Sequence, residues 1–364
     1  MVFNSIFFIF CFLPVFMLIY YLVPGKLRNL LLFLGSLIFY AWGEPVYVIL
    51  MLFSSIFNYY MGTELERLYY DDRKQKINLI FSIIINLAVL VFFKYYGFLL
   101  NTIGGIIGIH IPHPELSLPI GLSFYTFRNL SYLFDIYLSK VSAQRNFLTF
   151  AVYSTMFPYT SAGPIVRYTD IETQLKQRTI NISKFGTGAE LFVKGLAKKV
   201  LLADNLSVLY SSICGHPQMS VFTSWLGILA YTMQLYFDFS GYSDMAIGLG
   251  KMLGFDFNKN FDYPYISTSV SEFWRRWHIS LGSWFRDYIY IPLGGNRVST
   301  LKHIRNILVV WALTGLWHGA SWNFVLWGVY YGLFLLLEKF VLQKYLKKIP
   351  SWLCTVYTLS LIHI

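Results

Sequence analysis

The chain has 364 residues, of which 56% are hydrophobic, 20% aromatic and only 13% charged, and its mean hydropathy is +0.53. A soluble domain normally carries about 25% charged residues, so the composition excludes an ordinary soluble protein and indicates a polytopic membrane protein. The net charge of +11 does not indicate nucleic-acid binding. The lysines and arginines lie scattered between apolar runs, as orientation signals and contacts with anionic lipids do.

Apolar runs follow one another along the whole chain, and at about 20 residues per span there is room for roughly ten spans. The runs are Val2–Val23, Leu30–Trp42, Val46–Met61, Ile77–Leu100, Leu118–Leu138, Leu148–Tyr159, Ala189–Leu209, Val221–Gly250, Ile304–His318, Asn323–Val341 and Trp352–Ile364. Several are too short to span alone and predict broken, re-entrant or tilted helices that pack against protein. Glu44-Pro45 predicts a tight turn. The expected fold is an all-α polytopic integral membrane protein.

The basic residues predict an orientation in the membrane. They follow the first, third and fifth runs, whereas the Asn101–Ser117 connection after the fourth run contains neither lysine nor arginine. If the basic loops are cytoplasmic, the N-terminus and Asn101–Ser117 lie outside the cell. Basic residues then crowd Gly163–Lys199, which we expect to be mainly cytoplasmic and partly amphipathic at the membrane interface.

Near the C-terminal third, Tyr265–Gly295 alternates charged and aromatic residues and is too polar to face lipid on all sides. It predicts an amphipathic or re-entrant helix at the membrane interface, where tryptophan and arginine are favoured. Pro292–Arg297, with two consecutive glycines, predicts a turn after it.

His318 is an ionisable residue inside an apolar run, and such residues are costly in a membrane and commonly functional. It is either a core histidine that bonds to a neighbouring helix or a general base that takes a proton from an attacking hydroxyl. Gly315 and Gly319, one helical turn apart, permit a close helix approach or a channel. Three tryptophans are candidates to line such a channel: Trp317, Trp322 and Trp327.

His278 follows Arg275, Arg276 and Trp277 in the interfacial segment. Two interpretations remain open. The histidine is an interfacial residue among aromatics and the arginines are lipid anchors, or the four residues line a polar cavity in which the arginines attract an anionic substrate.

Carboxylates and hydroxyls interrupt another apolar run at Asp238, Ser240 and Asp244. Asp238 can orient a histidine, pair with an arginine or cap a helix broken at Gly241, and pairing is favoured over direct chemistry. Pairing or snorkelling also explains four other charges in apolar surroundings: Lys94, Arg128, Asp135 and Glu190. Three dispersed cysteines and two histidines 40 residues apart give no metal-ligand spacing, so no metal site is expected.

Several segments together resemble the membrane-bound O-acyltransferase (MBOAT) family, and most of all its branch of alginate O-acetyltransferase membrane subunits. They are Phe273–Leu281, Trp284–Tyr288, Ile291–Arg297, Gly315–Trp322, Tyr236–Asp244, Ser123–Phe127 and Ala162–Ile165. The likeness covers essentially the whole chain. It implies a single transmembrane domain over residues 1–364, with about ten transmembrane or re-entrant helices around a central tunnel. The family pattern continues past Ile364, so we expect the chain to be truncated at its C-terminus.

The resemblance also assigns roles to residues. The residue that matches His318 is the essential one, within a tunnel through a thinned membrane centre, and the residue that matches His278 lies on the cytoplasmic side. We therefore expect His318 and His278 to be catalytic. The residues expected to bind substrate or line the tunnel are Arg275, Arg276, Trp277, Trp317, Asp238, Ser240, Asp244 and Asn323.

The implied function is O-acetylation of an extracytoplasmic polysaccharide, alginate or another cell-surface polymer, by a multi-pass enzyme of the bacterial inner membrane. The implied donor is acetyl-CoA or another acyl thioester, with no bound cofactor, and an esterase-like (SGNH) partner outside the membrane is expected to finish the transfer. D-alanyl transfer to teichoic acid, the activity of a sister branch, is the alternative. A transporter with a proton relay through His318, Asp238 and Glu190 stays open, whereas a structural scaffold leaves the histidine without a purpose.

Overall fold

The computed structural model describes residues 1–114, 116–216 and 218–362, and these form helices and connections without a β-strand among them. The expected all-α class is therefore confirmed. Glu115, in the Asn101–Ser117 connection, and the last two residues of the run that ends at Ile364 lie outside the described residues.

The described chain forms two compact units, and each is continuous in space but not in sequence. The first consists of Met1–Ile56 and Gln144–Asn260, and the second of Phe57–Ala143 and Phe261–Ile362. Helix α3, Val48–Arg67, crosses the boundary between them. The single domain expected over residues 1–364 stays a prediction.

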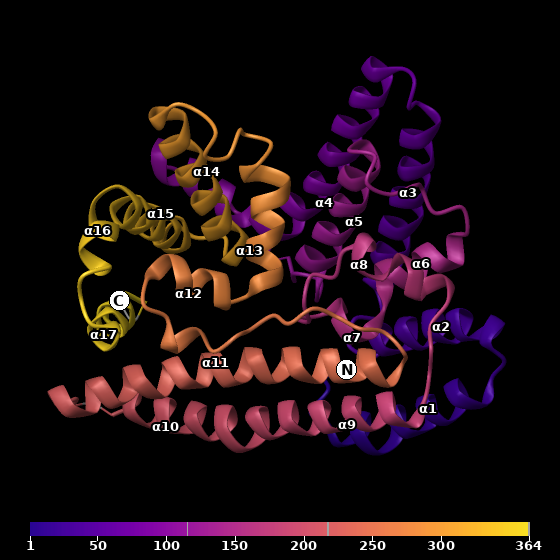
Figure 1. The fold of residues 1–364 in the computed structure, drawn as a ribbon, viewed down its shortest axis with the longest axis horizontal. Helices are drawn as coiled ribbons and strands as arrows, with labels where there is room; N and C mark the ends of the chain where they lie inside the picture. The colour runs from indigo at the N-terminus through magenta and orange to yellow at the C-terminus, as the bar shows by residue number, and fades with distance from the viewer. Residues whose placement is uncertain (115, 217, 363–364) are drawn as a thin grey trace. The chain divides into compact units, whose positions relative to one another are not determined.

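Among its described residues, the first unit holds the short segments η1 (Phe8–Phe12) and η2 (Gly25–Leu27) and nine further helices or helical segments. Figure 1 shows their arrangement. The nine are α1 (Leu13–Leu22), α2 (Arg28–Ala41), α6 (Phe147–Thr155), α7 (Phe157–Thr160), α8 (Tyr168–Lys176), α9 (Ile182–Ala197), the π-helical η3 (Lys198–Ala203), α10 (Asp204–Cys214) and α11 (Val221–Met252). Phe157 is fully buried and gathers rings from the N-terminal helices: its centroid lies 5.4 Å from Phe16 and 5.4 Å from Phe39. This aromatic cluster forms the core of the unit.

Helices α9 and α11 run side by side in the first unit, as Figure 1 shows. Glycines at the contact let the two backbones meet. A Cβ atom on Gly195 would lie 2.5 Å from the carbonyl oxygen of Gly241, and one on Gly188 would lie 2.7 Å from that of Gly248. Small residues spaced one or two turns apart are the usual means of close helix packing in membranes. Gly241 thus serves a packing contact within an unbroken α11, and the helix break considered there is absent.

The second unit holds the remaining helices. They are α4 (Asp72–Ile107), α5 (Leu122–Tyr137), the 3-10 turn η4 (Pro264–Ile266), α12 (Val270–Arg276), α13 (Ile279–Phe285), the π-helical η5 (Arg286–Tyr290), α14 (Thr300–His318), α15 (Trp322–Leu337), the π-helical η6 (Glu338–Leu342), α16 (Gln343–Leu346) and α17 (Ser351–Ile362). Helix α5 is central, since 13 of its 16 residues are buried. The indole N–H of Trp284 donates to the carbonyl of Phe127 at 2.9 Å and the two rings stack, which joins α13 to α5.

By length and composition, three helical stretches among the described residues suffice to cross a membrane: Val48–Arg67, Asp72–Ile107 and Trp322–Leu346. The 36 residues of α4 extend about 54 Å at 1.5 Å per residue, well beyond the hydrocarbon core of a bilayer. The shorter apolar helices include Phe8–Leu22 and Ser351–Ile362. The apolar runs of the sequence thus correspond to helices, whereas the number of spans stays a prediction.

The structure tests two local predictions, one for a turn and one for the segment rich in charged and aromatic residues. The turn at Glu44-Pro45 is confirmed, because the Val48 amide donates to the Glu44 carbonyl across it. The amphipathic or re-entrant helix expected within Tyr265–Gly295 is interrupted, because that segment contains the end of η4, then α12, α13 and η5. The break between α12 and α13 lies at one of the two histidines.

Candidate active site

His278 occupies the break between α12 and α13. Its backbone is left-handed, with φ 45° and ψ 54°, a conformation that is uncommon for residues other than glycine. Because α12 ends at Arg276 and α13 begins at Ile279, the histidine forms the corner of a tight turn and is 3% exposed. Such backbone strain occurs mostly where the surrounding structure holds a residue for a functional purpose.

Glu338 fixes the start of the helix that leads to His278. This buried carboxylate, at the beginning of η6, accepts the backbone N–H of Val270 at 2.6 Å and that of Ser271 at 2.9 Å. It also accepts the Ser271 hydroxyl at 2.7 Å. A negative charge at a helix N-terminus is favourable, and the first amides of a helix need such acceptors. Glu338 therefore sets the direction of α12 toward the histidine.

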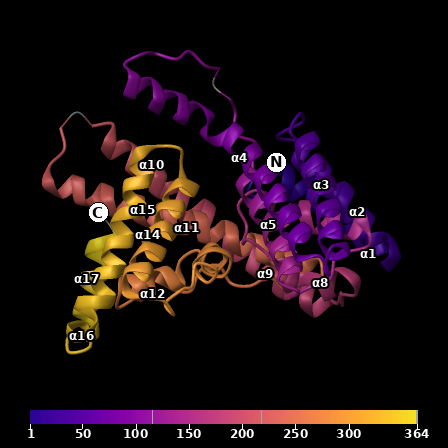
Figure 2. The ribbon, with the colours of Figure 1, turned by 90° about the horizontal axis from the view of Figure 1, so that it is seen from above.

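His318 is the last residue of α14, whose partner is α15 (Figure 2). Glycines again bring the two backbones together: a Cβ atom on Gly315 would lie 2.2 Å from the carbonyl oxygen of Phe324, and one on Gly328 would lie 2.2 Å from that of Trp311. The close helix approach predicted from Gly315 is confirmed. The α14–α15 contact thus holds the helix end that carries the imidazole.

Aromatic rings surround both histidines. The ring centroid of Trp317 lies 5.7 Å from His278 and 5.0 Å from His318, and Trp327 packs edge-on against His318 at 4.9 Å. Trp274, on α12, packs against Trp327 at 5.6 Å. The indoles therefore pack directly against both imidazole rings.

Both histidines line one cavity of about 940 Å³ within the second unit. Arg275 and Trp277 line it too, as does Thr314 one turn before His318. The structure therefore brings together four of the site residues predicted from sequence, although His278 and His318 are 40 residues apart. A cavity of this size accommodates a small organic ligand.

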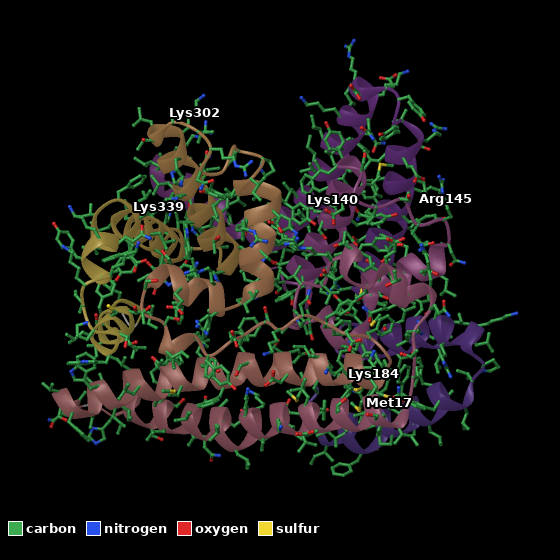
Figure 3. All side chains as sticks on the ribbon, in the orientation of Figure 1. Met17, Lys140, Arg145, Lys184, Lys302 and Lys339 are labelled. Carbon is green, nitrogen blue, oxygen red and sulfur yellow. The ribbon has the colours of Figure 1, made fainter. Side chains whose placement is uncertain are left out.

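The cavity walls carry more positive than negative charge. Arg275, Arg286, Lys339 and Lys347 line it, whereas its one lining carboxylate among the described residues is Glu338, which is bound to the start of α12. Lys339, on η6, is labelled in Figure 3. This balance favours an anionic ligand.

The two adjacent arginines differ. Arg276 pairs with Glu272 at 2.9 Å and with Asp262 at 3.6 Å, and it is not among the residues that line the cavity. Arg275 lines the cavity. Arg276 is thus held in ion pairs, whereas Arg275 faces the cavity. Substrate binding by the two arginines stays a prediction.

Burial, with a smaller effect of the neighbouring His318, lowers the pKa of His278 to about 3. A histidine with such a pKa is neutral at physiological pH. His278 can therefore donate or accept a hydrogen bond in the cavity without adding a positive charge to it.

A second cavity, of about 800 Å³, lies beside the connection that follows His318. Ala320, Ser321 and Trp322 line it, together with Lys94 of α4 and His113 of the Asn101–Ser117 connection. His318 on the first cavity and Ala320 on the second are separated by Gly319 alone. The end of α14 therefore forms part of the wall between the two hollows.

Four predicted site residues lie elsewhere. Asp238, Ser240 and Asp244 belong to α11 in the first unit, where Asp238 pairs with Lys199 at 2.9 Å and Asp244 with Lys198 at 2.6 Å. The favoured interpretation of Asp238 as an ion-pair residue thus fits, with a lysine in place of the arginine. Asn323 is exposed and lines neither cavity. Their roles in substrate binding stay predictions.

Other charges predicted to be paired have the expected partners. Asp135 accepts from Lys140 at 3.1 Å and from the Tyr288 hydroxyl at 2.8 Å, and Glu190 pairs with Lys194 at 2.6 Å. Lys140, and Lys184 of the other unit, are labelled in Figure 3. The pairing of Asp135 and Glu190 is confirmed.

Two residues at the site were not singled out from the sequence. Glu338 lies near the C-terminal end of the apolar run Asn323–Val341, next to Lys339, so no local pattern marks it as a site residue. Lys94 carries a clear signal, a single charge within Ile77–Leu100, but in the sequence snorkelling or pairing explains it as well. The structure shows Lys94 bound to the carbonyl oxygen of Trp317, next to His318.

Comparison with known proteins shows the family. The model of the membrane-bound O-acyltransferase family matches residues 42–350, which include both histidines. The probable alginate O-acetylase AlgI of Pseudomonas aeruginosa is 45% identical over 343 residues, which are 93% of this chain and 66% of that protein. The chain thus spans slightly less than two thirds of that relative's length.

Two relatives carry other names. The peptidoglycan O-acetyltransferase of Helicobacter pylori is 34% identical over 402 residues, covering 99% of this chain and 76% of that protein. The teichoic acid D-alanyltransferase of Bacillus subtilis is 27% identical over 259 residues, covering 67% of this chain and 64% of that protein. The family model spans the helices that carry both histidines and most of the chain besides. With two histidines on one cavity and this breadth of similarity, the chain belongs to the membrane-bound O-acyltransferase family.

Proposed function

We propose that this protein transfers an acetyl group from a thioester donor to a hydroxyl acceptor, with His318 as the general base. The observation that carries the proposal is the position of His318 at the wall between two cavities. It lines the first, which is rich in positive charge, and lies two residues from Ala320, which lines the second.

The chemistry needs one base at the point where donor and acceptor meet. The neutral imidazole of His318 takes the proton of the acceptor hydroxyl as its oxygen attacks the acyl carbon. When the tetrahedral intermediate breaks down, the carbon–sulfur bond breaks and the imidazolium returns the proton to the departing thiolate. An ester and a free thiol result, with no net change at the histidine. His278, neutral and on the same cavity, orients the reactants by hydrogen bonding.

The two cavities suit the two substrates. Arg275, Lys339 and Lys347 on the first fit the phosphate groups of acetyl-CoA, since arginine and lysine both bind phosphate well. The second adjoins Asn101–Ser117, the connection that lacks basic residues and is predicted to lie outside the cell. The donor would then enter from the cytoplasm and the acceptor from the opposite side.

The acceptor we propose is a cell-surface polysaccharide of the alginate type, acetylated directly or through an esterase-like (SGNH) protein outside the membrane. The similarity to probable alginate O-acetylases supports this choice over D-alanyl transfer, because the D-alanyltransferase match is weaker and shorter. We further propose a multi-pass location in the bacterial inner membrane, with about ten spanning or re-entrant helices around a tunnel.

Reconstituted protein in liposomes tests the proposed function. In one assay, labelled acetyl-CoA is supplied with an alginate oligosaccharide as acceptor. In a parallel assay, a D-alanyl carrier protein is supplied as donor with teichoic acid as acceptor. The products of both are detected by mass spectrometry. Label on the oligosaccharide, or on an added partner protein, supports the proposal. D-alanyl ester without acetyl ester favours the alternative, and solute flux without acyl transfer favours a transporter.

A further inference from the structure

The last turn of α14 ends without the donors that a continuing helix would supply. Gly319, immediately after His318, has φ −165° and ψ 154°, so the chain leaves the helical path there. Carbonyl groups in the final turn of a helix have no partner four residues ahead and need donors from elsewhere. The carbonyls of Leu316 and Trp317 belong to this group, and they directly precede the imidazole.

Two consecutive residues of α4 supply those donors. The hydroxyl of Tyr95 donates to the carbonyl oxygen of Leu316 at 2.6 Å, and the ammonium of Lys94 donates to that of Trp317. Both residues lie more than 200 positions before their acceptors in the sequence but in the same compact unit. Helix α4 is continuous from Asp72 to Ile107, so it offers a rigid support.

Two physical effects favour a lysine at position 94. A cation is favoured at the C-terminal end of a helix, where the peptide dipoles leave partial negative charge. The Lys94 nitrogen also lies 5.6 Å from the centre of the Trp317 ring, within range of a cation–π interaction. A charge in an apolar helix is costly, and these contacts are what offset its cost.

We propose that Lys94 and Tyr95 are positioning residues that hold His318 at the wall between the cavities by closing the last turn of α14. They bond to the backbone of α14, so they act through His318. For its effect on rate, the inference rests on the proposed function. A displacement of about 1 Å at a reacting group can lower a rate on the order of 100-fold, so loss of the support should lower kcat.

Purified protein in lipid nanodiscs, in four variants, tests this. Lys94→Met removes the charge and the donor, Lys94→Arg keeps both, and Tyr95→Phe removes one hydroxyl. Lys76→Met is the matched control, because Lys76 is an exposed lysine of the same helix. Each variant is measured twice: by amide hydrogen exchange of residues 313–321, and by steady-state acetyl transfer with donor and acceptor varied.

We expect Lys94→Met to speed exchange over 313–321 and to lower kcat by about 10- to 100-fold, with KM for the donor unchanged within about 2-fold. Tyr95→Phe should do the same to a smaller extent, and Lys94→Arg should recover most of the rate. Lys76→Met should match the wild type in both measurements.

Two results would overturn the inference: exchange over 313–321 that is equal in Lys94→Met and Lys76→Met, or a raised KM with kcat unchanged. If Lys94→Met does not fold, Tyr95→Phe decides, since it removes a single oxygen. If the wild type transfers no acyl group, the proposed function fails, and the exchange measurement alone decides whether the support exists.

Discussion

The α9–α11 pair of the first unit and the α14–α15 pair of the second are both packed through glycines. They differ in the surroundings of their polar side chains. In both, glycines let one helix touch the backbone carbonyls of the other. Polar side chains of α11 pair with charges on η3, the segment that continues α9, as Asp238 does with Lys199. At the end of α14 the polar side chain is His318, and it lines a cavity.

The comparison shows that the neighbours of a charged or polar residue in an apolar helix indicate whether its role is structural or chemical. Asp238 and His318 are equally conspicuous in sequence, and each interrupts an apolar run. The first has an opposite charge beside it on a neighbouring segment, while the second has aromatic rings and open space. Ion pairs within packed helices are mostly structural, whereas an ionisable group on a cavity suits chemistry. Five predictions test this distinction.

The largest effect is expected at His318. His318→Ala should lower the rate of acetyl transfer by about 1,000-fold or more, because the attacking hydroxyl loses its base. Donor binding, measured by equilibrium titration, should change little. His110→Ala, an exposed histidine of the Asn101–Ser117 connection, is the control and should transfer at the wild-type rate. A normally folded His318→Ala protein with full activity would refute the role.

The next effect concerns the folded state. Gly315→Ala places a methyl group 2.2 Å from the Phe324 carbonyl oxygen, and Gly195→Ala places one 2.5 Å from that of Gly241. Backbone atoms cannot move aside cheaply, so each should lose about 1–3 kcal/mol of stability. Gly186→Ala, where no atom lies within 4 Å, should be neutral or stabilising. Thermal unfolding in detergent measures all three, and equal midpoints for the three variants would mean that the two helix pairs are not in close contact.

Glu338→Gln should have a smaller effect on rate. The glutamine amide keeps one acceptor oxygen for the Val270 amide, the Ser271 amide and the Ser271 hydroxyl. The start of α12 is then held less firmly, and so is the turn at His278. We expect about a 10-fold lower kcat and a loss of about 1–3 kcal/mol in stability. The matched change in the other unit is Glu190→Gln, which removes an exposed pair with Lys194 and should leave the stability almost unchanged. Comparable losses in the two variants would argue against a role for Glu338 in holding α12.

Replacement of Arg275 and of Arg276 should have different effects on KM for acetyl-CoA. Arg275→Ala should raise KM for acetyl-CoA by about 10-fold, because Arg275 lines the basic cavity. Arg276→Ala should leave KM unchanged and lower the unfolding temperature slightly, because its partners are Glu272 and Asp262. Kinetics with varied donor concentration separate them, and the assignment is wrong if Arg276→Ala raises KM as much as Arg275→Ala does.

The smallest effect is expected at Asp238. Asp238→Asn keeps the shape of the side chain and removes an ion pair that is partly exposed, so the transfer rate should stay within about 2-fold of the wild type. Asp238 belongs to the alternative proton relay, so abolished proton uptake in this variant, together with a wild type that takes up protons but transfers no acyl group, would favour the transporter interpretation. Stopped-flow measurement of proton uptake into liposomes completes the comparison.

The sequence predicted the elements of the fold well and their junctions less well. Apolar runs separated by basic loops correspond to helices because membrane helices need long apolar stretches. The turn at His278 could not be foreseen, since a left-handed histidine leaves no mark in residue pattern. The η6 segment and the buried Glu338 depend on contacts between positions 68 residues apart, which no local pattern contains.

The site was predicted in part, for a similar reason. Arg275, Trp277 and the two histidines stand out as polar or aromatic residues in apolar or interfacial surroundings, and the structure places them on one cavity. Arg276 looks the same in sequence, and only the positions of Glu272 and Asp262 show that it is engaged elsewhere. Lys94 was visible as a lone charge, but its acceptor lies on a helix more than 200 residues away.

The central claim is that His318 joins a donor cavity to an acceptor cavity on its other side. The most direct test is a liposome in which the protein has one orientation, with labelled acetyl-CoA on the side of the basic loops and the acceptor on the other. The account predicts acetylated acceptor on the far side in the wild type and none in His318→Ala. Acetylated product that forms only when donor and acceptor share one side would contradict it.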